Sequence, residues 1–307
     1  MSMRSSDFPE LLDTPLRKIF FQMELPRAEY PSWVNIVETR RNFEDDLRMA
    51  EFGAVPAAVE GDVIIYDDAQ ELQTKRYTPE LFALGFNVTQ IMREDDQHGQ
   101  IVKLTKSLRK SMRYRFEVTS ANLFNGCTAT TLERDVGFDD LALLSTAHTD
   151  GDGGTQSNRP TTAVVISNTA VEAGVKAFHG WKDQRGVMPI LAVPTMAVVS
   201  GDYQFIAARI FKNAMRYDTA DNDENWIRKG PDGNGISTYL VSRYLTNTKY
   251  WFLLADKSEH DLNLFIRVQP EFQTSVDFQT GNYMVKCRAR LQASHGDWRG
   301  VYGSPAT

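Results

Sequence analysis

The longest helical pattern in the chain, from about residue 95 to 125, constrains the fold more than any other segment. Apolar residues recur there at three- and four-residue spacing at Ile101, Leu104, Leu108 and Met112, as expected for a helix with one buried face. About 28 helical residues, each rising 1.5 Å, form a rod of about 42 Å. Such a rod requires a long surface to pack against, and its length is unusual in a globular enzyme domain.

The other face of this predicted helix is basic. Its cations are Lys103, Lys106, Arg109, Lys110, Arg113 and Arg115. A cluster of this kind can contact nucleic-acid phosphates, pair with acidic residues of neighbouring molecules, or remain solvated. No aromatic residues interleave on that face to stack bases, and no nucleic-acid recognition motif is present. The sequence leaves these three alternatives open.

The last thirty residues hold a second strong pattern. Apolar and polar residues alternate from residue 283 to 292, which predicts a strand with one buried face. A glycine-rich turn at residues 296–300 ends it. The apolar positions are Tyr283, Val285, Cys287, Ala289 and Leu291.

Composition excludes several classes of protein. The 307 residues suffice for two domains or one large one, and 42% of them are hydrophobic. A net charge of -6 argues against a protein built as a whole to grip nucleic acid. Cys127 and Cys287 give neither a disulfide framework nor zinc spacing. No secretory signal and no apolar run of membrane-spanning length is visible, so we expect no membrane partner.

The first third of the chain is predicted to be extended. Four prolines within residues 1–32 leave room only for a short helix at Leu16 to Met23, so we expect an arm that lies on a neighbouring molecule. Strands are predicted at Trp33 to Val37, Val63 to Tyr66 and Leu81 to Val88. Polar residues dominate between them. A long hairpin without its own core requires another surface.

Residues 161 to 265 predict one compact α/β unit. Its helices are expected at 169–184 and 203–215, its strands at 190–199, 239–245, 250–254 and 262–268, and a polar loop at 218–235.

Three apparent catalytic or binding motifs fail on inspection. Ser145, His148 and Asp150 lie within one turn, whereas a working triad draws its members from separate elements. The glycine-rich segment from residue 150 lacks the calcium ligands of an EF-hand, and the one from residue 230 lacks the lysine of a phosphate loop. The histidines show no metal-ligand spacing. We therefore predict no catalytic, cofactor or metal site.

Four segments, in order, resemble the phage Mu-like major head subunit family. They are LGFNVTQIMREDD at 84–96, LLSTAH with GGTQSN at 143–158, TADND at 219–223, and DFQTGN with DWRGVYGS at 277–304. The chain is similar to that family from about residue 84 to 306.

This resemblance implies an α+β fold, the Hong Kong 97-type phage capsid fold. The family's parts map onto an N-terminal arm at 1–40, an E-loop hairpin at 41–82, a P-domain at 83–160 with its spine helix at about 95–125, an A-domain at 161–265, and a return to the P-domain at 266–307. The implied function is that of the major capsid protein of a tailed bacteriophage, prophage or phage-like particle. Its pentamers and hexamers would form an icosahedral head around double-stranded DNA, in the virion, after assembly in the host bacterial cytoplasm.

The resemblance also implies partners and sites. No long charged helical region precedes the arm, so we expect either a separate scaffolding protein or a scaffolding segment that has been removed. A portal and a possible decoration protein are the other expected partners. The basic helix face is expected to face the DNA-filled lumen or a neighbouring subunit. A relative crosslinks its subunits through a lysine and an asparagine; Lys75 lies in the hairpin, but the sequence reveals no acceptor. A loop near the capsomer axis is expected to hold Asp218, Asp221, Asp223, Glu224, Arg228 and Lys229.

Two alternatives belong to other classes. An encapsulin-like compartment shares the capsid fold but carries enzymes, and a stand-alone soluble enzyme would require a site that the failed motifs do not provide. We therefore expect a structural protein and no enzyme.

Overall fold

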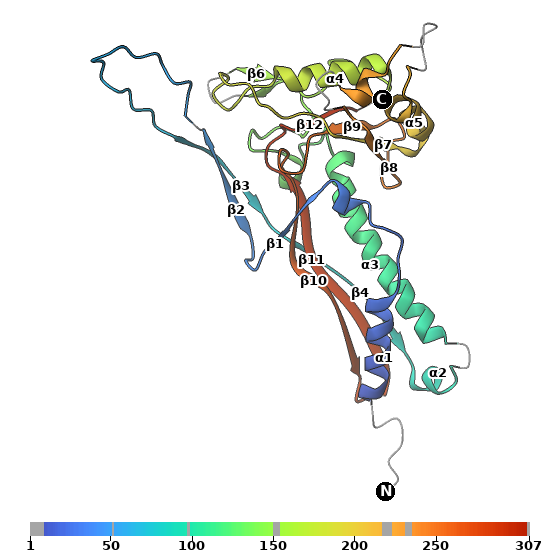
Figure 1. The fold of residues 1–307 in the computed structure, drawn as a ribbon. Coiled ribbons are helices and arrows are strands. Elements are labelled where there is room, and N and C mark those ends of the chain that lie inside the picture. The colour runs from blue at the N-terminus through green and yellow to red at the C-terminus, as the bar shows by residue number, and fades with distance from the viewer. Residues whose placement is uncertain are drawn as a thin grey trace.

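A computed structural model describes residues 9–50, 52–96, 99–149, 154–216, 223–230 and 235–305. It shows an α+β subunit with an elongated unit, a compact unit and a projecting hairpin (Figure 1). In the elongated unit, α3 (Gln100–Asn125) runs beside the long strands β10 (Leu262–Val276) and β11 (Tyr283–His295).

The sheet of the elongated unit has the strand order β1-β10-β11-β4. β1 (Asn35–Glu38) is parallel to β10, whereas β11 is antiparallel to both β10 and β4 (Glu80–Val88). Every second side chain from Tyr283 to Leu291 is buried, as the alternation predicted, and this face packs on α3. The β10–β11 register shifts between Ile266 and Glu271, beside Pro270, whose nitrogen cannot donate to a ladder. β10 is longer than predicted, and it lies in this sheet rather than in the compact α/β unit to which the sequence assigned it.

The predicted long helix is confirmed, but it begins about five residues later. A separate helix, α2 (Gln90–Glu94), precedes it. The Asp96 carboxylate accepts hydrogen bonds from the backbone N–H groups of Gln100 at 2.8 Å and Ile101 at 3.1 Å. Gly126 caps the other end. The 26 helical residues span about 39 Å.

The N-terminal segment packs on its own subunit. α1 (Pro9–Gln22) is longer than predicted and continues through Pro15. Leu16 and Phe20 are buried in the same cluster as residues of α3, and the Phe20 ring centroid lies 4.9 Å from that of Phe272 on β10. The prediction that the arm lacks internal partners is therefore wrong from residue 16 onward. Apolar burial compensates for the backbone hydrogen bond that Pro15 cannot make.

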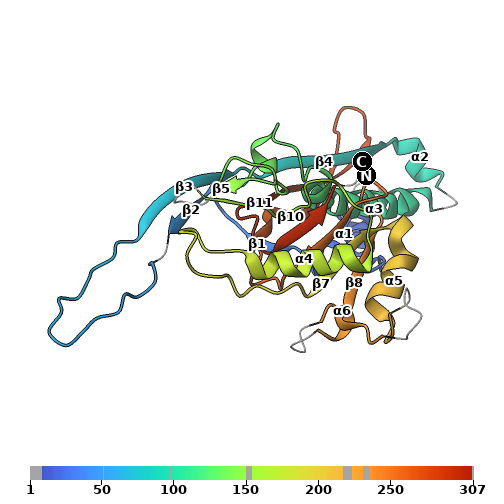
Figure 2. The same ribbon diagram turned by 90° about the horizontal axis from the view of Figure 1, so that it is seen from above.

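The hairpin pairs β2 (Glu44–Ala50) with β3 (Gln70–Tyr77) and projects away from both units (Figure 2). The predicted strand at residues 63–66 is wrong, because these residues lie in the exposed hairpin loop, residues 53–69, and find no ladder partner among the described residues. The strand predicted at 33–37 begins instead at Asn35, after a 3-10 turn at Tyr30–Ser32.

The compact unit has a second sheet, with the strand order β12-β9-β7-β8. The strand predicted from residue 190 begins only at residue 196, since Pro194 interrupts it. Helices α4 and α5 are confirmed with shorter bounds. The elements are α4 (Asn168–Gly180), β7 (Met196–Ser200), α5 (Gln204–Lys212), α6 (Trp226–Lys229), β8 (Thr238–Ser242), β9 (Trp251–Leu254) and β12 (Val301–Ser304). The short elements are 3-10 helices at Glu133–Asp135 and Gly201–Tyr203 and strands β5 (His148–Thr149) and β6 (Thr155–Gln156).

Strand β9 joins the cores of the two units. Phe252 and Leu254 belong to the hydrophobic cluster that contains α3, whereas Trp251 and Leu253 belong to the cluster of the compact unit. All four side chains are fully buried, so both faces of this strand are covered. No helix in the described part of the chain is both long and apolar enough to cross a bilayer.

Candidate assembly site at the root of the hairpin

A buried lysine anchors the hairpin. Lys75, on β3, is only 7% exposed, and its ammonium group donates hydrogen bonds to the carbonyl oxygens of Val136 and His295. Burial lowers the pKa of Lys75 to about 8, against the opposing field of carboxylates that include Asp261 and Asp139. In this conformation the amine is turned into its own subunit, so it is not presented to an acceptor on another subunit.

Asp261 lies beside this lysine. Its carboxylate accepts hydrogen bonds from the backbone N–H of Asp297 at 3.0 Å and from the Asn263 side chain. Burial nevertheless raises the pKa of Asp261 to about 6. Next to it, the Tyr77 ring stacks on Phe265 with 4.3 Å between centroids. Strand β3 is thus held to β10 and to the terminal turn by both charge and apolar contact.

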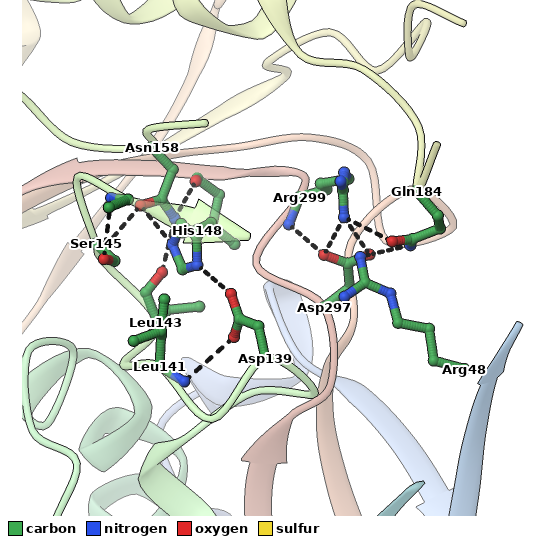
Figure 3. A network of polar contacts seen from close by, with 12 residues as sticks. Arg48, Asp139, Leu141, Leu143, Ser145, His148, Asn158, Gln184, Asp297 and Arg299 are labelled. Carbon is green, nitrogen blue, oxygen red and sulfur yellow. Dashed lines mark hydrogen bonds and ion pairs between the residues drawn. The ribbon is translucent and has the colours of Figure 1, made fainter. Parts of the chain in front are cut away.

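Strand β2 is held by a second buried network (Figure 3). The Asp297 carboxylate accepts hydrogen bonds from Nη2 of Arg48 at 3.0 Å, from Nη1 of Arg299 at 3.2 Å and from the Gln184 side-chain amide at 3.2 Å. Burial alone would raise the pKa of Asp297, but the charges of Arg299 and Arg48 hold it below its usual value. Arg48 and Arg299 are 7% and 5% exposed, whereas the Asp297 side chain is 22% exposed, so the two arginines are buried and the carboxylate between them is half-buried.

His148 lies near this network, and its contacts hold a loop in place (Figure 3). Its Nδ1 lies 2.6 Å from Asp139, its Nε2 lies 3.1 Å from Asn158, and its ring stacks on Trp298 at 4.4 Å. The Ser145 hydroxyl instead accepts a hydrogen bond from the backbone N–H of Ala147. The fully buried histidine orients this loop rather than activating a serine.

The six predicted cations of α3 do not share one face. The Arg115 guanidinium lies 3.7 Å from the Phe82 ring centroid on β4, whereas Arg109 lies 5.2 Å from the Phe20 ring of the N-terminal segment. Arg113 pairs with the buried Glu117 at 3.3 Å and lies over Tyr30. These three arginines therefore join parts of one subunit. The cations left exposed on α3 are Lys103, Lys106 and Lys110.

The predicted axis loop is described only in part, since Asp218 and Asp221 lie outside the described residues. Lys229 pairs with Glu224 of the same chain at 2.7 Å, with both side chains exposed. The Asp223 carbonyl accepts from the Arg216 backbone N–H at 2.8 Å, and Arg228 is exposed. Lys229 thus already has a carboxylate partner within its own subunit.

The hairpin loop exposes several large apolar side chains. Its exposed side chains are Val55 (94%), Val59 (75%), Val63 (86%), Ile64 (73%), Ile65 (71%) and Tyr66 (87%). Single exposed apolar residues are ordinary, but six within one short loop indicate an interaction surface.

Sequence reasoning missed most of the buried root. Arg48, Asp261 and Asp297 are single charges among many, and nothing local distinguishes a buried charge from a solvated one. A partial signal existed at the terminal turn, where a tryptophan lies between an aspartate and an arginine among glycines. Lys75 drew attention only as a possible crosslinking residue.

Comparisons with known proteins agree with this architecture. A family model described as phage capsid protein matches residues 70–304. No curated protein sequence matches the chain.

Solved structures with the same fold are distant in sequence. The procapsid subunit of bacteriophage JBD30 is 15% identical, with 98% of this chain and 76% of that chain covered and a TM-score of 0.52. The capsid subunit of a native GTA particle is 12% identical, with 93% of each chain covered and a TM-score of 0.58. A virus-like particle from Pyrococcus furiosus is 7% identical, with 97% and 99% covered and a TM-score of 0.54.

The family match covers most of the chain and includes β3, α3, both long strands and the compact unit. The solved structures add the fold, an elongated unit with a long helix beside a compact unit, which is the Hong Kong 97-type. The chain therefore belongs to the phage capsid protein family, a structural family of bacteriophage heads.

Proposed function

We propose that copies of this chain assemble into pentamers and hexamers that close an icosahedral head around double-stranded DNA. Residues 1–40 are assigned to the arm, 41–82 to the E-loop, 83–160 and 266–307 to the P-domain, and 161–265 to the A-domain, although β12 (Val301–Ser304) pairs with β9 in the compact sheet. Scaffolding and portal proteins are the proposed partners, with a possible decoration protein, and assembly takes place in the host bacterial cytoplasm.

The exposed apolar hairpin loop carries this proposal. Six large apolar side chains have no partner among the described residues of their own subunit, and the root fixes the hairpin so that it points away from the body (Figure 2). A neighbouring copy is the occupant that the family match supports. Contacts of this obligate kind are expected to bury more than about 2,000 Å² per subunit, summed over neighbours.

Changing Val63, Ile64 and Ile65 together to serine is expected to abolish shells without unfolding the subunit. Each change removes roughly 1.5 kcal/mol or more of burial at a contact, so the concentration needed for assembly rises at least about a hundredfold. Light scattering measures assembly, and urea unfolding measures stability. Changing Ala57, Ala58 and Glu60 to serine alters the same exposed loop without this apolar loss, and normal shells are expected. Equal assembly of the two variants contradicts the proposal.

Negative-stain microscopy of the expressed protein separates the competing functions. Closed shells of head-like size that package DNA support the proposal. Shells filled with protein cargo instead support an encapsulin-like compartment, the second candidate, since a virus-like particle also has this fold. Small monodisperse particles contradict both.

The three exposed lysines of α3 are the proposed contact with packaged DNA. Lys103, Lys106 and Lys110 follow one stripe of the helix, and no ion pair of theirs is found within the described residues. Because the protein's net charge is -6, a stripe of three cations can hold DNA only weakly, without reading its sequence. This placement requires the stripe to face the lumen.

Changing these three lysines to glutamate is expected to weaken DNA binding and leave folding intact. Losing three phosphate contacts lowers the slope of log affinity against log salt by about 2.7. Duplex binding measured between 50 and 200 mM salt checks this. The control variant changes Lys176, Lys212 and Lys286, exposed on α4, α5 and β11, and alters the net charge equally. A control that loses the same affinity contradicts a specific DNA face.

The loop at residues 218–235 is the proposed capsomer-axis element. Its carboxylates would crowd around a five- or six-fold axis, where like charges repel. The Lys229–Glu224 pair within one subunit relieves part of that repulsion.

A further inference from the structure

A tight turn of the compact unit points an arginine at the hairpin. In residues 183–186, the Gly186 N–H donates to the Asp183 carbonyl at 3.2 Å, and Gly186 adopts φ 68°, which favours glycine. The Asp183 carboxylate accepts the backbone N–H groups of Val187 at 2.9 Å and Met188 at 3.2 Å. These bonds fix the turn that carries Arg185.

The same turn is attached to the buried root of the hairpin. Arg299 donates from Nε to the Lys182 carbonyl at 2.9 Å and from Nη2 to the Asp183 carbonyl at 3.2 Å. Its guanidinium also pairs with Asp297, which binds Arg48 of β2 (Figure 3). The position of Arg185 is therefore coupled to the hairpin root.

Arg185 binds the base of the hairpin loop, a few residues beyond the root. Its Nη1 donates to both carboxylate oxygens of Asp67, at 3.0 and 2.8 Å, and its Nη2 donates to the Asp68 carbonyl at 2.8 Å. The Gly53 N–H, on the opposite side of the loop, also donates to Asp67 at 2.8 Å. The Gly53 hydrogen bond and the Arg185 contact lower the pKa of Asp67. Both sides of the loop thus meet at one carboxylate.

The two attachments differ in strength. The cations of the root, Lys75, Arg48 and Arg299, are 5–7% exposed, whereas the side chains of Asp67 and Arg185 are 42% and 19% exposed. An exposed ion pair contributes little free energy and is weakened further by salt. Residues 53–69 make no other hydrogen bond or ion pair to the compact unit within the described structure.

We propose that Asp67 and Arg185 form a breakable latch that holds the hairpin against its own compact unit. The root is the pivot. Closed, the latch sets the hairpin angle within one subunit; open, it lets the apolar loop swing towards a second copy. That last consequence rests on the proposed function, but the latch itself does not.

Distance measurement between two spin labels tests the latch. Labels are placed at Val59→Cys in the loop and Lys176→Cys on α4, both exposed, while the native Cys127 and Cys287 are buried. An excess of unlabelled chain ensures that only distances within one chain are measured, whether or not shells form. Asp67→Asn is expected to increase the fraction of molecules with an open latch, seen as a changed distance between the two labels, roughly two- to fivefold. In the parent protein, 0.5 M salt is expected to increase the same fraction.

A second exposed ion pair provides the matched control. Arg76 binds Asp45 in two-point geometry at 2.7 and 2.9 Å, but this pair joins β2 to β3 and does not touch the compact unit. Asp45→Asn is expected to leave the distance distribution unchanged. The double variant Asp67→Arg with Arg185→Asp, which exchanges the two charges, is expected to restore the distance distribution of the parent protein.

An unchanged distribution in Asp67→Asn overturns the latch, and so does an equal change in Asp45→Asn. If the latch fails this test, the proposal that the chain forms shells still stands, because microscopy measures assembly separately. Conversely, a protein that forms no shells can still show the latch in the distance measurement.

Discussion

Trp298→Ala is expected to destabilise the subunit by about 3–5 kcal/mol, the usual cost of deleting a buried tryptophan. Trp298 is 1% exposed. Its ring stacks on His148 at 4.4 Å and meets Trp181 edge-on at 5.3 Å. The truncation leaves a cavity between the terminal turn and the compact unit, where Asp297 and Arg299 organise the hairpin root. Urea unfolding followed by circular dichroism measures the loss.

Trp226→Ala provides the matched control, because its side chain lies on α6 and is 52% exposed. Removing it is expected to change the free energy of unfolding by only about 0.5 kcal/mol. Unfolding midpoints that are equal for the two variants would show that the terminal turn does not pack as described.

Phe20→Ala is expected to cost about 3–5 kcal/mol, since the side chain is fully buried in its own subunit. Phe20 contacts Phe272, and the Arg109 guanidinium lies over its ring. The adjacent Phe21 is 43% exposed, so Phe21→Ala is expected to cost about 1 kcal/mol or less. Thermal unfolding of the two variants, which differ by one position on α1, checks the difference.

This result also decides how the N-terminal segment works. If the arm lay only on a neighbouring molecule, deletion of residues 1–30 would leave a soluble subunit that cannot close shells. With Leu16 and Phe20 buried on α3, that deletion is expected to expose the elongated core and to destabilise the subunit itself. A deletion variant that unfolds at the same urea concentration as the full chain would show that the N-terminal segment does not stabilise its own subunit.

The helix α3 and the strand β11 were determined by the sequence alone. Their periods of 3.6 and 2 residues are local patterns, and each repeats over many residues. The C-terminal end of α3 followed as well, at Gly126, whereas its start lies about five residues later than the pattern indicated. Four short motifs in order were enough to reach the family, since spacing along the chain survives where overall identity is low.

Only the tertiary structure decided which charged side chains are buried, which partners they bind, and where the hairpin is attached. Arg109 and Arg115 look like members of one basic face, but the folded arm and β4 cover them from different sides. The sequence around Lys75 is typical of an exposed lysine in a polar hairpin. In the structure, the carbonyl of His295, 220 residues later in the chain, accepts a hydrogen bond from its amine. Burial and partner choice depend on contacts between distant segments, and no local pattern of residues records those contacts.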